Sequence, residues 1–361
     1  MRAGIILLLA AALVAGILIM VMPGCGGNGG GSPGGQPKVV ATTTMLGDAV
    51  EILLEGTGIE STALIKPGVD PHLFELQAAD AKRLQAADLV IYNGFNLEGK
   101  MSDALEKMNG VAVADSVPEG RRIGATAEGY SGTHDPHVWM DVGLWAEYAL
   151  PAVADALKAE YPDQAATIDS NLSAYQAELV GLDNYVRQAI SLVPEQQRIL
   201  ITAHDAFGYF GQAYAIEVQG VQGLSTTSEA GTARVSELVN LIVDRKIPAV
   251  FVESSVPQKY LEKLVEGVEA AGHTVELAPA IFSDSTGPAG KFEGTYAGMI
   301  DHNATIIAME LGAQNIDLHG HFGKLTLGHD HGHEDHAGAE EHDDHEDHDD
   351  HEGHDHDEEP E

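Results

Sequence analysis

One long amphipathic helix near the middle of the chain sets the strongest constraint on the fold. Apolar residues recur at steps of three and four between Asp163 and Leu192, and no proline interrupts this stretch. A helix of about 28 residues is about 42 Å long. Short strand patterns alternate with helical patterns on both sides of it, so the helix joins two βα-repeating halves.

The two halves predict an α/β protein with two Rossmann-like lobes, a connecting helix and a cleft between the lobes. We assign the N-terminal lobe to residues 38–162, the linking helix to 163–193 and the C-terminal lobe to 194–328. In the first lobe we expect strands at Val39–Thr44 and Leu89–Gly94, with a helix at Leu46–Leu54.

The second lobe shows the same alternation. Its expected strands are Arg198–Ala203, Ala249–Glu253 and Thr274–Ala278, and its expected helices are Ala206–Tyr214, Val235–Arg245, Gln258–Ala271 and Tyr296–Leu311. Because open α/β sheets bind ligands beyond the carboxyl ends of their strands, site residues are expected just after these strands.

The start of the chain resembles a bacterial lipoprotein signal. Arg2 precedes an apolar run from Ala3 to Met22, and the small residue Gly24 precedes Cys25, the single cysteine. Residues 1–25 are therefore interpreted as a signal peptide with Cys25 as the lipidation site, followed by a Gly-rich tether at 26–37. The alternative is an uncleaved transmembrane anchor, because about 20 apolar residues can cross a bilayer. Either way, we expect the body outside the cytoplasm and attached to a membrane, in the periplasm or on the cell surface.

The composition is strongly acidic. With 56 acidic residues against 19 lysines and arginines, the formal net charge is -37. Such a surface repels nucleic acid, which excludes polyanion binding as a function, and it attracts cations. An acidic surface also serves solubility alone.

The last segment, residues 329–361, contains ten of the eighteen histidines and 17 acidic residues, and it has no large apolar residue that could build a core. We expect it to be disordered without metal and to hold several weak auxiliary metal sites, which would concentrate or sense metal. The alternative is a charged solubility tail. The histidines of residues 329–361 are His329, His331, His333, His336, His342, His345, His348, His351, His354 and His356.

Three histidines of the body stand in distinctive loops. His72 lies in the sequence Gly-Val-Asp-Pro-His-Leu-Phe-Glu, and His137 repeats the Asp-Pro-His element in His-Asp-Pro-His-Val-Trp-Met-Asp. Glycine and proline force a tight loop at the first of these positions. His204 directly follows the expected strand that ends at Ala203, which is where a ligand residue is expected.

These three segments, together with Phe282–Ser285, resemble the zinc and manganese substrate-binding lipoproteins of bacterial ABC transporters. The resemblance covers about Lys38 to Gly323. It implies a metal held between the lobes, captured outside the cell and delivered to a membrane permease and its ATPase. It also implies the ligands His72, His137, His204 and Asp284. We expect a monomer without enzymatic activity.

Three imidazoles and one carboxylate suit zinc, whereas manganese, the alternative metal, prefers more oxygen ligands.

His134 is interpreted as solvent-facing or as a residue that supports a ligand. Glu253, at the end of its strand, either tunes the site or caps the next helix. Asp70, Asp135 and Asp205 neighbour the three histidines and are expected to orient loops or cap helices.

Two other functions fit the same residues less well. A zinc-dependent enzyme needs an open coordination position and a general base, and the sequence has no His-Glu-x-x-His motif. A surface adhesin needs an exposed apolar or aromatic patch, and aromatic residues make up only 6% of the chain.

Overall fold

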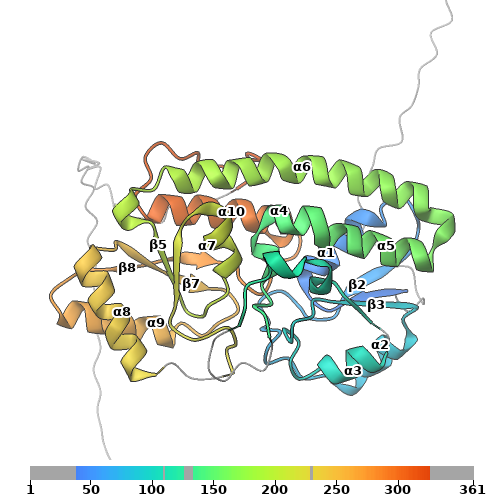
Figure 1. Cartoon of the computed structure of the whole chain (residues 1–361), viewed down its shortest axis with the longest axis horizontal. Helices are drawn as coiled ribbons and strands as arrows, with labels where there is room; N and C mark the ends of the chain where they lie inside the picture. The colour runs from blue at the N-terminus through green and yellow to red at the C-terminus, as the bar shows by residue number, and fades with distance from the viewer. Residues whose placement is uncertain (1–37, 109, 126–132, 228–230, 326–361) are drawn as a thin grey trace, which may run out of the picture.

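The computed structural model describes residues 38–325 except 109, 126–132 and 228–230 (Figure 1). Cys25, the tether at 26–37 and the ten tail histidines lie outside the described residues. Within the described part of the chain, no helix combines the length and the hydrophobicity needed to cross a membrane.

The N-terminal lobe contains a four-stranded parallel sheet in the order β2-β1-β3-β4. Its strands are β1 (Val39–Ala41), β2 (Ser61–Ala63), β3 (Leu89–Tyr92) and β4 (Val111–Ala112). The helices that accompany it are α1 (Thr44–Leu53), α2 (Ala78–Ala86) and α3 (Ser102–Lys107). The two central strands are the apolar ones that the sequence predicts.

The C-terminal lobe repeats this arrangement, with a parallel sheet in the order β6-β5-β7-β8. Its strands are β5 (Ile199–Thr202), β6 (Glu217–Gly220), β7 (Ala249–Glu253) and β8 (Glu276–Ile281). Its helices are α7 (Gly208–Tyr214), α8 (Thr232–Arg245), α9 (Lys259–Ala270) and α10 (Tyr296–Glu310).

Helix α6 (Ala165–Ser191) connects the lobes and runs along both of them (Figure 1). It packs against α1 and α5 (Leu150–Glu160) of the first lobe and against α7 and α10 of the second. A short α4 (Val142–Leu144) and a π-helical turn precede α5. The face of α6 that meets the lobes is apolar, and its buried residues are Ile168, Tyr175, Leu179, Leu182, Val186, Ala189 and Ile190.

One continuous apolar core runs through both lobes. Trp145 lies in it and stacks on Tyr296 of α10, with ring centroids 5.0 Å apart. A smaller cluster that includes Val40 and Leu84 covers the other face of the first sheet. Because the lobes share a core beneath α6, they are packed as one body rather than tethered by the helix alone.

The predicted element boundaries differ from the observed ones by up to three residues, and two strands are among the elements with the largest differences. The β-branched run after Val39 was assigned to a strand as far as Thr44, but the strand ends at Ala41. The Thr43 side chain accepts the backbone N–H of Leu46 and caps α1, so Thr44 is already helical. The strand expected at Thr274–Ala278 lies at Glu276–Ile281, where it pairs with β7 through an irregular register.

Candidate metal centre

Four side chains from four loops meet between the lobes. His72 lies in the loop between β2 and α2, and His137 directly precedes a 3-10 turn in the first lobe. His204 follows β5, and Asp284 follows β8. One ligand atom from each of the four residues lies within 4.8 Å of the others, and all four side chains are buried. The structure thus brings together the four residues that the resemblance in the sequence implies as ligands.

The imidazoles surround the carboxylate of Asp284. Its oxygens lie 3.1 Å from Nε2 of His204, 3.4 Å from Nε2 of His137 and 3.7 Å from Nε2 of His72. The three rings are arranged edge to face, with centroids 5.4 to 5.9 Å apart. The Nε2 atoms of the three rings therefore face one point.

These inward-facing atoms contact one another at ion-pair distances but make no hydrogen bond of good geometry among the described residues. The three Nε2 atoms and both carboxylate oxygens of Asp284 are buried and unpaired by hydrogen-bond geometry. Buried polar atoms left in this state are costly unless another group satisfies them. Nitrogen and carboxylate lone pairs directed at one point are the donor set of a divalent transition metal.

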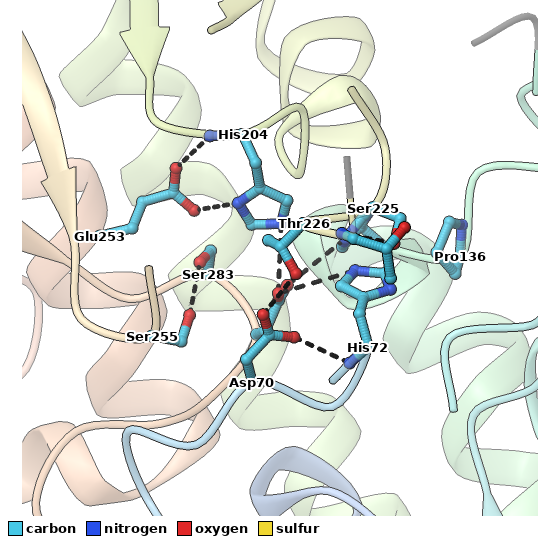
Figure 2. Close-up of polar contacts among 12 residues, drawn as sticks. Asp70, His72, Pro136, His204, Ser225, Thr226, Glu253, Ser255 and Ser283 are labelled. Carbon is cyan, nitrogen blue, oxygen red and sulfur yellow. Dashed lines mark hydrogen bonds and ion pairs between the residues drawn. The ribbon is translucent and has the colours of Figure 1, made fainter. Parts of the chain in front are cut away.

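Two further carboxylates support the imidazoles from behind. Asp135 lies 2.7 Å from Nδ1 of His137 and accepts the backbone N–H of the same residue at 2.9 Å. Glu253 lies 2.6 Å from Nδ1 of His204 and accepts its backbone N–H at 2.8 Å (Figure 2). A carboxylate on Nδ1 keeps the proton there and leaves the Nε2 lone pair free for a metal.

The buried groups of the cluster shift one another's pKa values. Burial lowers the pKa of His72 to about 3, so this ring is neutral. Burial is the largest influence on His137 and acts to lower its pKa, but Asp135 and Asp284 together outweigh it and raise the pKa to about 9. Burial opposes the charge of His204 as well, but Asp284 and Glu253 raise its pKa well above the usual value.

Asp284 is the counterpart of these imidazoles. Burial acts to raise its pKa, but His204 and His137 hold it well below the usual range. The metal-free site therefore carries positive charge on imidazoles against a buried carboxylate. A bound cation would take over that role and displace the protons.

Other residues that the sequence singled out lie around the centre. His134 does not join the four-residue group: its Nε2 lies 3.1 Å from Glu119, and its ring packs on Phe95. The pKa of Asp205 is raised. Burial is the main cause, and the negative charge of the nearby Asp135 is the second. Asp70 accepts the backbone N–H of His72 at 2.8 Å, which is the loop-orienting role expected for it.

Several contacts between the lobes had no signal in the sequence. The indole N–H of Trp139 donates to the Ser283 carbonyl at 2.9 Å, directly before Asp284 in the chain. The backbone N–H of Gly68 donates to Oγ of Ser285 at 2.7 Å, and Oγ of Thr226 donates to Asp70. The first two join loops that carry candidate ligands, and the third joins the His72 loop to the loop between β6 and α8.

The two-lobed α/β fold with a buried His and Asp cluster between the lobes is that of a metal-binding protein. Comparisons with known proteins identify its family. The family model described as zinc-uptake complex component A, periplasmic, matches residues 39–310. The chain belongs to this family. The predicted family and fold are thereby confirmed.

Among characterised relatives, the zinc-binding protein TroA of Treponema pallidum (strain Nichols) is 44% identical over 277 residues, covering 75% of this chain and 88% of the relative. The manganese-binding lipoprotein MntA of Bacillus subtilis (strain 168) is 42% identical over 278 residues, covering 76% and 89%. The chain is a metal-binding, substrate-binding protein of an ABC transporter and not an enzyme.

Solved structures agree with this assignment. The periplasmic zinc-binding protein TroA from Treponema pallidum aligns with a TM-score of 0.72 at 43% identity, over 77% of this chain and 99% of that one. Fe(III)-bound YtgA from Chlamydia trachomatis aligns with a TM-score of 0.69 at 25% identity, over 77% and 99%. The relatives' names thus include zinc, manganese and iron.

Proposed function

We propose that this protein captures zinc outside the cytoplasm and delivers it to the permease and ATPase of an ABC importer. The ion would be held by His72, His137, His204 and Asp284. The observation that carries this proposal is the convergence of four buried ligand groups within 4.8 Å, with their inward atoms unpaired among the described residues. Such a site replaces the hydration shell of a cation with protein donors.

Zinc is the metal that this donor set favours. Three imidazole nitrogens and one carboxylate match the coordination number and the mixed donors of zinc. Asp135 and Glu253 contact Nδ1 of His137 and His204, respectively, and make these imidazoles stronger ligands. The similarity to a zinc-binding protein at 44% identity supports the same choice.

Manganese is the second candidate, and one observation favours it. Both oxygens of Asp284 are unpaired, so the carboxylate can bind through both and raise the coordination number to five. The similarity to a manganese-binding lipoprotein at 42% identity points the same way.

Attachment to the membrane and supply of metal would depend on the two ends of the chain. Cys25 would carry the lipid anchor, and residues 26–37 would tether the body to the outer side of the cell membrane. The tail histidines would bind further ions weakly and raise their local concentration. Replacing Cys25 with serine should release the protein from membranes into the soluble fraction, whereas continued membrane attachment would favour the transmembrane alternative.

Equilibrium dialysis tests the binding proposal. A chain ending at Leu327 should hold one zinc ion tightly and select it over manganese when both are offered. His204→Ala should lose that ion, because it removes a ligand from a site with only four. His134→Ala is the matched control, because His134 pairs with Glu119 instead. Equal zinc binding by His204→Ala would contradict the site.

A further inference from the structure

The three imidazoles are not held equally. A carboxylate fixes the ring of His137 and that of His204 through Nδ1. His72 differs, because its nearby acid, Asp70, holds the backbone N–H instead of the ring. The Nε2 atom of His72 is also the farthest of the three from Asp284. The position of this ligand therefore depends on where its loop lies.

The loop of His72 forms the outer wall of the site. His72 is 2% exposed, whereas Val69 and Leu73 in the same loop are 38% and 44% exposed. A few residues thus separate the candidate metal position from solvent. His72 is as buried as Asp284, but the residues beside His137 and Asp284 are buried as well, whereas the His72 loop borders solvent, so an outward movement of this loop would open the centre.

A hydrogen bond across the lobes holds this wall in place. Oγ of Thr226, in the loop between β6 and α8 of the second lobe, donates to Oδ2 of Asp70 (Figure 2). The other oxygen of Asp70 accepts the backbone N–H of His72. One carboxylate thus links a hydroxyl of the C-terminal lobe to a candidate ligand of the N-terminal lobe.

We propose that Thr226 is a positioning residue that latches the His72 loop across the lobes and sets how fast bound metal leaves. This inference rests on the proposed metal site. A hydrogen bond to a charged acceptor stabilises more than a neutral one. Breaking it removes one of the two hydrogen bonds that join this loop to the second lobe within the described residues, and the other, from Gly68 to Ser285, remains. His137, His204 and Asp284 stay in place. The latch therefore acts on release more than on the ligand set.

The test compares dissociation rates from the full chain loaded with one equivalent of zinc, measured by stopped-flow transfer to a chromogenic chelator. Thr226→Val keeps the shape but removes the donor, and should speed release roughly tenfold. Thr226→Ser keeps the hydroxyl and should restore the wild-type rate. Thr227→Val, whose hydroxyl contacts Ser225 instead, is the matched control on the same loop.

A double-mutant cycle with Asp70→Asn separates the latch from general destabilisation. If the two side chains act through one contact, adding Thr226→Val to Asp70→Asn should cause little further acceleration. Wild-type release from Thr226→Val, or full additivity in the cycle, would overturn the latch while leaving the metal site intact. Failure of the wild-type chain to retain one zinc ion would instead overturn the proposed function and the latch with it.

Discussion

Glu253 contacts His204 twice, through the ring Nδ1 at 2.6 Å and through the backbone N–H at 2.8 Å. One buried carboxylate thus sets both the position and the tautomer of the first residue after β5. Asp135 has the same double contact with His137 in the other lobe. The two lobes therefore prepare one imidazole each in the same way, and Asp284 lies against both.

Replacing Glu253 with glutamine should weaken zinc binding by about 10- to 100-fold. The amide offers an N–H toward Nδ1, which favours the tautomer with its proton on Nε2, where the metal should bind. Competition against a chelator of known affinity measures the effect. Glu262→Gln, on the exposed face of α9, is the control. Equal affinity in both variants would show that Glu253 does not tune the site, which leaves its alternative role near the next helix.

Asp284→Asn should reduce manganese affinity more than zinc affinity. Manganese depends on oxygen donors, whereas three imidazoles remain available to zinc. Isothermal titration with each metal gives the two ratios to wild type, with Asp244→Asn on the exposed part of α8 as the control. A larger loss for zinc would mean that the carboxylate determines zinc preference, contrary to this account.

Trp139 should report metal binding by its fluorescence. Its ring packs edge-on against His137 with centroids 5.2 Å apart, and its N–H donates to Ser283 beside Asp284. The chain has two tryptophans, and Trp145 stacks on Tyr296 instead. Zinc titration of Trp145→Phe should keep the emission change, and Trp139→Phe should lose it. A change that persists in Trp139→Phe would place the signal elsewhere.

Asp48 should make the metal-free protein less stable as the pH rises. Burial raises its pKa to about 6, and it accepts the backbone N–H of Tyr296 across the lobes at 2.9 Å. Because the folded state holds this proton more tightly than the unfolded chain, the group favours folding below about pH 4. That contribution, at most about 3 kcal/mol, is lost as the pH passes through 6.

Asp48→Asn removes this titration. Its free energy of unfolding relative to wild type, measured by denaturant at pH 4.5 and pH 7, should therefore rise with pH. Glu266→Gln on the exposed face of α9 is the control, because Glu266 does not act on Asp48. A difference that stays constant between the two pH values would show that Asp48 is ionised throughout.

The central strands and the long helix could be predicted, because their signals are local. The apolar residues of β1, β3, β5 and β7 and the three- and four-residue steps of α6 follow directly from burial. The edge strands β2, β4 and β6 were missed. Ser61–Ala63 and Glu217–Gly220 are short and half-exposed, so pairing with a neighbour, rather than their own pattern, makes them strands.

The candidate ligands could be identified from loop motifs, but their surroundings could not. Asp135 and Glu253 were known only as acids near a histidine or at a strand end, and their contacts with Nδ1 depend on side-chain geometry. Thr226 has no motif at all. Its partner Asp70 is distant in sequence, and only the packing of one lobe on the other brings the two together.

Anomalous diffraction at the zinc absorption edge, from crystals of the protein grown with one equivalent of zinc, tests the central claim most directly. We expect one strong peak between the Nε2 atoms of His72, His137 and His204 and the carboxylate of Asp284, at about 2.0–2.2 Å from each donor. A protein that holds its zinc away from these four residues would contradict it.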